Sequence, residues 1–356
     1  MLTQKQLTTI SVNAIAVKML LTYPRVLILM CGNAAWINSL YCTALAVLLF
    51  GAIRLIYNTD RNIIDAAAEV GGTCLRVIVG VILFIVMSAN VVSLIRVFPE
   101  IIKLVLLQNT PEEIIGVIFI AALILGAMCG IEAIGRVHEI FIPIAGIVFV
   151  IFLLLLIPKY NIELIFPILG KGPFKLFIEG ISGLSIFSDI LLLNMLISHT
   201  KSIDNYKKTG TKSIIIGGLC AFCITAAYTL SYAYPASENF LVPVYQLERM
   251  IYLSNFFSRF EAVFQFIWTI SILLYGSVYL AVLTEVWETS FKISSAKINI
   301  AAIAVILIGA AVFPRSLSVT TEWEMTITRW MYIPVFLLPL AVGLFHRIKK
   351  RNRNRK

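Results

Sequence analysis

Long apolar runs recur along almost the whole chain, and they constrain its fold more than any other feature. A helix of about 20 apolar residues is long enough to cross the hydrocarbon core of a bilayer. Charged residues make up 13% of the 356 residues, where a soluble domain usually has about 25%. Too few charges are present to cover a water-exposed surface. The sequence therefore predicts an all-α integral membrane protein that forms a single polytopic domain over residues 1–356.

Charged residues, Gly and Pro divide the apolar sequence into ten expected spans. The first half covers about 8–158, the second half covers about 180–346, and 347–356 form a basic cytoplasmic tail. Basic residues are more frequent at the ends that this arrangement places inside, above all in the tail, so both termini are expected in the cytoplasm. The net charge of +10 then reflects membrane orientation and not nucleic-acid binding. The spans lie near 8–31, 35–57, 75–107, 113–130, 140–158, 180–200, 211–234, 262–286, 298–313 and 330–346.

Residues for metal or enzyme chemistry are sparse, and no metal site, cofactor or catalytic residue is expected. The three histidines are far apart in the sequence, at 138, 199 and 346. Cys220 and Cys223 form a CxxC inside an apolar run, where small apolar packing residues are expected. An intramembrane enzyme would need paired aspartates, a Ser–His arrangement or an HExxH, and the spans contain none of these. The chain is therefore not expected to be an enzyme.

Four ionisable residues lie well inside the expected spans: Lys18, Arg25, Arg96 and Asp189. Each costs about 2.5–3.5 kcal/mol at the centre of a membrane helix. Such residues usually face the interior of a bundle, pair with one another and mark functional sites.

Two of the spans that carry these charges also contain helix-breaking sequence. Thr22-Tyr23-Pro24-Arg25 lies in the first span, and proline removes a backbone donor there. Gly183 to Asp189 in the sixth span is rich in small residues. One interpretation is an ordinary proline kink with a structural ion pair. The other is a pair of discontinuous helices, each opening one half of an inverted repeat, with free backbone groups at a ligand site near the bilayer midplane.

Three further stretches resemble a known family in their order and spacing. They are Asn109-Thr110-Pro111 followed by 130–136 with Glu139 and Pro143, then Pro243 to Arg249 followed by Phe257, Arg259, Glu261, Phe264 and Trp268, and thirdly Pro24-Arg25 with Gly32 and Trp36. The combination resembles the B-subunit family of spore germinant receptors, the spore germination permeases of the amino acid–polyamine–organocation superfamily. The resemblance extends from about residue 3 to residue 346.

The resemblance implies a LeuT-type bundle of ten helices, a 5+5 inverted repeat in which helices 1 and 6 are broken. It implies a protein that senses an amino acid or similar small germinant together with an A subunit and a lipoprotein C subunit in the spore inner membrane. The residues expected to bind the germinant are Thr22, Tyr23 and Pro24 in the first break, Phe187, Ser188 and Asp189 in the second, and Arg96. Trp268 and Tyr275 are added because they lie two turns apart on one span, although they also fit a core or lipid-facing stripe.

Lys18 occupies a position near the first break where the family commonly has glycine. Its ammonium would stand where a transporter holds a sodium ion, which would favour sensing over pumping. The alternative is that Lys18 and Arg25 are snorkelling or ion-paired residues. Glu132, Arg136 and Glu139, spaced four and then three residues apart, are expected to form either a salt-bridged elbow or an inner gate. The competing function is a proton-coupled amino acid permease, because sensors and transporters share this architecture.

Overall fold

The computed structural model describes residues 1–200, 202–251, 260–295, 297–313 and 317–353, except for a few side chains in 260–295 and 317–353. Phe257 and Arg259 of the second motif lie outside these residues, as does the side chain of Glu261. The described chain is helical, and one isolated backbone bridge joins Leu2 to Thr200. The α-helices are α1 (Gln4–Leu20), α2 (Tyr23–Cys31), α3 (Ala35–Ile56), α4 (Ile63–Val105), α5 (Glu112–Met128), α6 (Ile131–Leu156), α7 (Pro173–Phe177), α8 (Ile190–Met195), α9 (Ile203–Ser231), α10 (Pro243–Arg249), α11 (Phe260–Phe291), α12 (Lys297–Val312) and α13 (Leu317–Arg353).

Seven helical segments of the described chain are long and apolar enough to cross a membrane. The segments are Tyr23–Ile56, Ile63–Val105, Ile131–Lys159, Pro173–His199, Ile203–Ser231, Val263–Phe291 and Arg329–Arg351. The chain is thus an all-helical, multi-pass membrane protein. The other predicted spans fall on shorter helices. The 17 residues of α5 and the 16 residues of α12 extend about 25 Å, somewhat less than a hydrocarbon core of about 30 Å, so the count of ten spans stays a prediction.

The first predicted span is interrupted where the sequence indicated. The helix α1 ends at Leu20, and α2 begins at Tyr23 with Pro24 in its first turn. Proline is well tolerated at a helix start because its missing N–H would have no helical partner there. Leu21 leaves helical geometry with ψ at −128°. The two helices therefore meet at a true break, not at a proline kink.

The sixth predicted span is wound differently from the expected discontinuous helix. Glu179–Asp189 form a 3₁₀ helix, η4, which continues into α8 and then into the 3₁₀ turn η5 (Leu196–His199). Only Phe187 departs from helical geometry inside η4. A 3₁₀ helix of this length is uncommon and often marks a strained or functional segment. The first part of this span is therefore wound more tightly than an α-helix, and it is not unwound as the prediction of a discontinuous helix required.

The third predicted span is longer than a membrane requires, and the structure accommodates it with a kink. The 43 residues of α4 contain two non-helical positions, Gly71 and Gly72. Gly72 has φ at +67°, a backbone conformation that glycine adopts without steric cost. Residues 63–70 therefore run in a different direction from the remainder of α4, which packs in the bundle.

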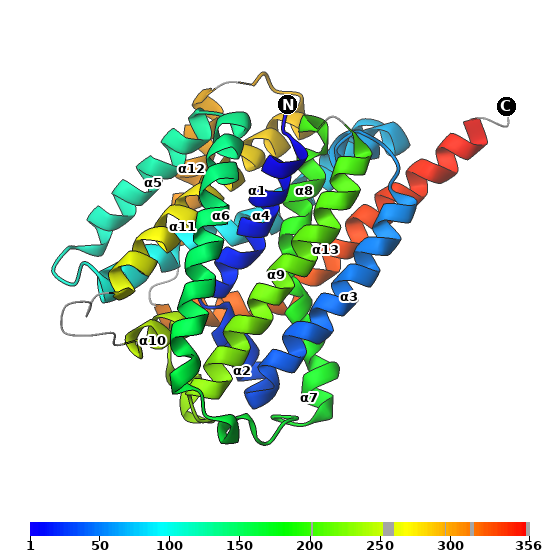
Figure 1. The fold of residues 1–356 in the computed structure, drawn as a ribbon. Helices are drawn as coiled ribbons and strands as arrows, with labels where there is room; N and C mark the ends of the chain where they lie inside the picture. Colours follow the sequence, from blue (N-terminus) through cyan, green and yellow to red (C-terminus); the bar gives the residue numbers. More distant parts are fainter. Residues whose placement is uncertain (201, 252–259, 296, 314–316, 354–356) are drawn as a thin grey trace.

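The bundle has one large apolar core and an apolar outer surface. Residues of α5, α6 and α12 expose large aliphatic side chains, among them Val117, Leu125, Ile140, Ile147 and Val305. In the hydrocarbon of a bilayer such side chains are in a matching solvent. The start of α1 and the end of α13 lie toward the same end of the bundle (Figure 1), here called the N-terminal end. This placement of both helix ends on one side agrees with an even number of spans.

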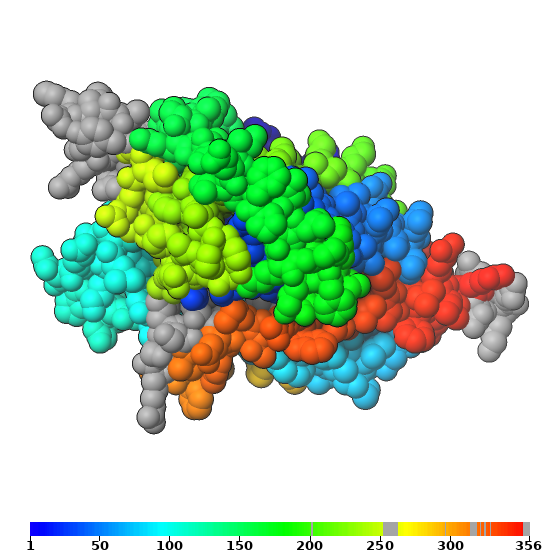
Figure 2. Space-filling model, turned by 90° about the horizontal axis from the view of Figure 1, so that it is seen from below, coloured from blue at the N-terminus to red at the C-terminus, as the bar shows by residue number. Residues whose placement is uncertain are grey.

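The opposite end of the bundle is covered by short segments that connect the long helices. Figure 2 shows this end, where residues of the green segment around α7 and of the yellow-green segment around α10 cover much of the face and parts of the blue N-terminal segment are visible between them. Val244, Leu247 and Glu248 of α10 are buried, so α10 packs into the bundle. The helices α7 and η6 (Ala236–Asn239) pack against α2, so these short segments form a cover over α2.

Candidate functional site

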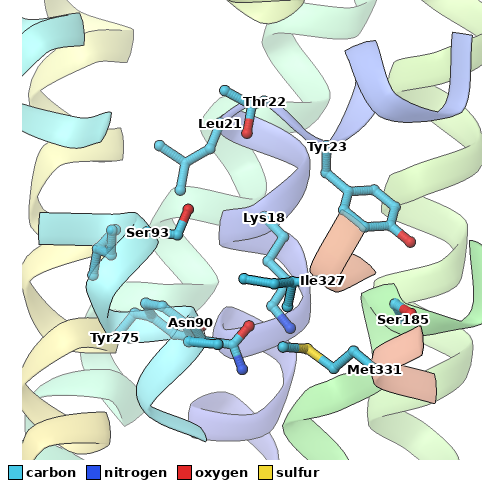
Figure 3. A pocket seen from close by; sticks show the side chains of 12 residues that line it. Lys18, Leu21, Thr22, Tyr23, Asn90, Ser93, Ser185, Tyr275, Ile327 and Met331 are labelled. Atoms are coloured by element: carbon cyan, nitrogen blue, oxygen red, sulfur yellow. The ribbon is translucent and has the colours of Figure 1, made fainter. Parts of the chain in front are cut away.

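A small cavity lies beside the break between α1 and α2. It has a volume of about 60 Å³, room for about two water molecules at about 30 Å³ each, or for a compact ligand of similar size. Figure 3 shows Lys18 reaching from α1 toward Asn90 of α4 and toward Ile327 and Met331 of α13. The lining residues come from six helical elements (α1, α2, α4, η4, α11 and α13) and from the break itself: Lys18, Leu21, Thr22, Tyr23, Ala89, Asn90, Ser93, Leu94, Ser185, Tyr275, Ile327 and Met331.

Among the lining residues whose side chains the structure describes, Lys18 is the charged one, and it forms a buried ion pair. Its Nζ lies 2.7 Å from Oδ2 of Asp189, and the two side chains are 11% and 1% exposed. Nζ also donates to Oγ of Ser188 and lies 3.5 Å from the carbonyl oxygen of Ile186. A carboxylate, a hydroxyl and a backbone carbonyl are the oxygen donors that hard cations prefer. The ammonium therefore occupies an oxygen cage built by the sixth span.

The other oxygen of Asp189 is held from α11. The hydroxyl of Tyr279 donates to Oδ1 of Asp189, and the amide of Asn90 lies 3.5 Å from the Tyr279 hydroxyl. The ring of Tyr275 packs beside that of Tyr279 at a tilt of 51°, with ring centroids 4.8 Å apart. A buried carboxylate is strongly disfavoured unless charge and hydrogen bonds compensate it. Lys18 and Tyr279 supply that compensation from opposite sides.

Tyr23 connects the start of α2 to the 3₁₀ part of the sixth span. Its hydroxyl donates to the carbonyl oxygen of Gly183 at 2.8 Å. Space is tight at this crossing, because a Cβ on Gly183 would lie 2.5 Å from Oδ1 of Asn38 and 2.9 Å from Sγ of Cys42. The small residues predicted to leave room in the sixth span thus allow close approach of α3 and α2 instead of exposing backbone to a ligand.

The structure brings some predicted binding residues to the cavity and places others behind it. Thr22, Tyr23 and Tyr275 line the cavity, together with Lys18. Ser188 and Asp189 reach it through their contacts with Lys18. Pro24 and Phe187 are buried but do not line it.

Arg96 and Arg25 point away from the cavity. The Arg96 guanidinium lies 3.1 Å from Glu100 one turn along α4 and 2.5 Å from Glu112 at the start of α5. Nε of Arg25 lies 3.4 Å from the carbonyl oxygen of Glu238 in the short η6 helix (Ala236–Asn239). Lys18 and Arg25 lie on different helices, α1 and α2, because the break separates them. Neither arginine contributes to the lining.

Trp268 lies in a second cavity, although it is on the same helix as Tyr275. The second cavity lies between α1, α6, α9 and α11 and is lined mostly by apolar side chains. Two helical turns separate the residues, but Tyr275 faces the first cavity and Trp268 faces the second. The two residues predicted to line one pocket therefore line two different cavities.

The predicted elbow residues pair with the N-terminal segment of the chain and not with one another. Lys5 of α1 lies 3.4 Å from Glu139, and the amino group of Met1 contacts Glu132. No ion pair to Arg136 is found among the described side chains. The backbone N–H of Leu2 donates to the carbonyl oxygen of His199 at 2.8 Å. These contacts close the N-terminal end of the bundle between α1, α6 and η5.

Several lining residues were not anticipated from the sequence, namely Leu21, Ala89, Asn90, Ser93, Leu94, Ser185, Ile327 and Met331. Tyr279, which holds Asp189, was also missed, although its spacing of four residues from Tyr275 is a helical-face signal. Asn90 and Ser93 form a polar pair on the long third span that could have been found by the same test. No group of three or more His, Cys, Asp or Glu side chains in the described part comes together as a metal site.

Comparison with known proteins identifies the family. A model of the spore germination protein family matches residues 1–317, most of the chain. No curated protein matches the chain closely enough to be called a relative. The match agrees with the resemblance found in the sequence motifs and with the multi-pass helical structure. The chain therefore belongs to the spore germination protein family.

Proposed function

We propose that this chain is the membrane subunit of a spore germinant receptor, and that it senses a small amino acid in the cavity beside the break between α1 and α2. The observation that carries the proposal is the buried Lys18–Asp189 pair at this break, next to a cavity lined by polar groups from α2, α4, η4 and α11. Ionisable residues inside a membrane protein are costly and usually mark a functional site. A receptor of this kind acts with A and C subunits in the spore inner membrane, with both of its termini in the cytoplasm.

The chemistry of the lining favours a compact zwitterionic ligand. The Lys18–Asp189 pair places charge of both signs beside the cavity, and Thr22, Ser93 and Ser185 bring hydroxyls to its lining. Asn90 offers an amide oxygen to an ammonium group. Leu94 and Met331 provide an apolar wall for a short side chain. With a volume of about 60 Å³, the cavity suits the smallest amino acids better than aromatic ones.

We further propose that the chain has the ten-helix LeuT-type arrangement, in which α1 and α2 form the first span and η4, α8 and η5 form the sixth. In that arrangement broken helices present backbone groups to coupling ions near the midplane. Lys18 then stands in place of such an ion, held by Asp189, Ser188 and Ile186. A permanently tethered cation cannot dissociate to the other side of the membrane. This feature favours a sensor over an ion-driven pump.

Ligand-dependent thermal stability of the purified protein tests the site. A small amino acid at about a hundredfold excess over its Kd is expected to stabilise the protein by about 2.7 kcal/mol. Asp189→Asn and Tyr23→Ala are expected to abolish or retune the germinant response while the protein still accumulates in the membrane. If both variants germinate normally at every ligand concentration, the proposed binding site is wrong.

The competing function is a proton-coupled amino acid permease, with Asp189 as the proton carrier. Reconstitution in liposomes separates the two functions. Binding of a radiolabelled amino acid without flux under a proton gradient supports the sensor, whereas saturable uptake driven by the gradient supports the permease. Lys18→Ala adds a further test, because an emptied oxygen cage is expected to make thermal stability depend on sodium relative to choline. The unchanged protein is expected to show no such dependence.

A further inference from the structure

The second cavity is an apolar space of about 290 Å³ between α1, α6, α9 and α11. Its walls are mostly aliphatic and aromatic side chains, and none of the described residues that line it is charged. Thr8 and Thr9, two of the few polar residues in the wall, turn their hydroxyls to backbone carbonyls of their own helix. An apolar cavity of about 150 Å³ stays dry and binds benzene. This larger cavity is therefore a poor site for water and a good site for hydrocarbon.

The mouth of the cavity faces the membrane between α6 and α9. Three residues line the cavity and are also exposed at the surface: Pro143 and Gly146 of α6 and Ile216 of α9. A Cβ added to Gly146 would have no heavy atom within 4 Å. On the same two helices Ile147 and Leu219 are exposed aliphatic residues. The opening thus lies within an apolar band, where the surrounding solvent is lipid.

We propose that an acyl chain of a bilayer lipid enters between α6 and α9 and occupies this cavity. An empty space of this size would leave its wall atoms without dispersion partners, and lipid tails are the molecules available at the mouth. The far wall of the cavity is α1, including Asn13, Ala16 and Leu20. The acyl chain therefore packs against the helix that carries Lys18, just before the break.

Trp268 is a natural reporter for the acyl chain, because its side chain lines the cavity yet is only 2% exposed. The experiment uses the full-length protein with Trp268 as the only tryptophan and Phe at the other four positions. The protein is placed in nanodiscs of phosphatidylcholine with or without bromine on its acyl chains, and bromine quenches indole fluorescence at near contact. A second protein that keeps only Trp330, which is 64% exposed, reports ordinary lipid contact.

The plugging variant is Gly146→Phe, and its matched control is Gly309→Phe on α12. Both glycines have open space around a Cβ, but only Gly146 lines the cavity. Quenching of Trp268 by brominated lipid is expected in the parent and in Gly309→Phe, and it should fall at least about threefold in Gly146→Phe. Trp330 should be quenched equally in all three backgrounds.

Two outcomes overturn the proposal. One is a Trp268 signal that brominated lipid leaves unquenched while Trp330 is quenched. The other is equal quenching of Trp268 with and without the plug. If Gly146→Phe does not accumulate as folded protein, Gly146→Leu takes its place with the same expected result. The test does not depend on any germinant and is therefore independent of the proposed function.

Discussion

The Lys18 ammonium lies 2.7 Å from Oδ2 of Asp189, and this contact joins the last turn of α1 to the residue that precedes α8. A cation in the last turn of a helix also complements the negative end of the helix dipole. The pair thus links the two irregular spans at one point. Any movement of α1 relative to the sixth span must therefore break this ion pair, or else the two side chains must move together.

Removing one partner of the pair is expected to be more damaging than removing both. Lys18→Met leaves Asp189 as a buried charge without its cation, which costs about 3–5 kcal/mol in comparable sites. The double variant Lys18→Met/Asp189→Asn contains neither charge and should recover most of that loss. Thermal unfolding of the detergent-purified proteins measures this difference. A double variant no more stable than the weaker single variant would contradict the predicted coupling.

Tyr279→Phe is expected to weaken the same site from the side of α11. The substitution removes the hydroxyl that donates to Oδ1 of Asp189, and a hydrogen bond to a charged group contributes about 1.5–3 kcal/mol. Both the free energy of unfolding and the apparent germinant affinity should fall. Tyr206→Phe is the matched control, because Tyr206 is a buried tyrosine whose hydroxyl bonds Asn194 at 2.5 Å and does not line the cavity. It should lose stability without changing the germinant response.

Hydropathy and proline placement predicted much of this fold from the sequence. The apolar runs determine where the long helices lie, because an unsatisfied backbone group in hydrocarbon is too costly for other structure. Pro24 predicted the break between α1 and α2 since its backbone has no N–H to continue the helix. The winding of the sixth span was not predictable in this way. Gly183 sits against Asn38 and Cys42 of α3, and such packing is a tertiary contact that has no local signal.

Buried charge predicted the centre of the candidate site but not its outline. Lys18 and Asp189 were found because a charge inside an apolar span requires a partner. Arg96 was expected in the same site for the same reason, yet its partners are Glu100 and Glu112. Pairing depends on which helix faces meet, and a single sequence does not determine this for helices separated by loops. For the same reason, the sequence does not reveal that Tyr275 faces the first cavity and Trp268 the second.

Lys171→Met is expected to loosen the cover over α2. The Lys171 ammonium lies 2.7 Å from Glu238 and donates to the carbonyl oxygen of Leu29 at 2.6 Å. Partial burial lowers the pKa of Lys171, but its hydrogen bond and ion pair with Glu238 outweigh that effect and raise the pKa above its ordinary value. The contribution of the pair to stability is therefore complete at neutral pH and is lost only as the pH rises through the raised pKa.

Labelling of Cys31, a buried residue of α2, measures this loosening. In a background with Cys74→Ser and Cys129→Ser, the rate of Cys31 alkylation at neutral pH is expected to rise several-fold in Lys171→Met. Lys175→Met is the control, since Lys175 pairs with Glu179 on the same cover but its ammonium has no contact with α2. Equal labelling rates in the parent and in Lys171→Met would show that the pair does not hold the cover closed.

Gly135→Val is expected to open the N-terminal end of the bundle. A Cβ at Gly135 would lie 2.8 Å from Cδ2 of Leu2, and Leu2 is fully buried there. The larger side chain should displace Leu2 and weaken the backbone hydrogen bond from Leu2 to His199. Amides in residues 2–10 are then expected to exchange with deuterium faster, because local opening becomes less costly. Gly51→Val, at a glycine with no atom within 4 Å of its Cβ position, should leave this exchange unchanged. Unaltered exchange in Gly135→Val would mean that Leu2 does not secure α1.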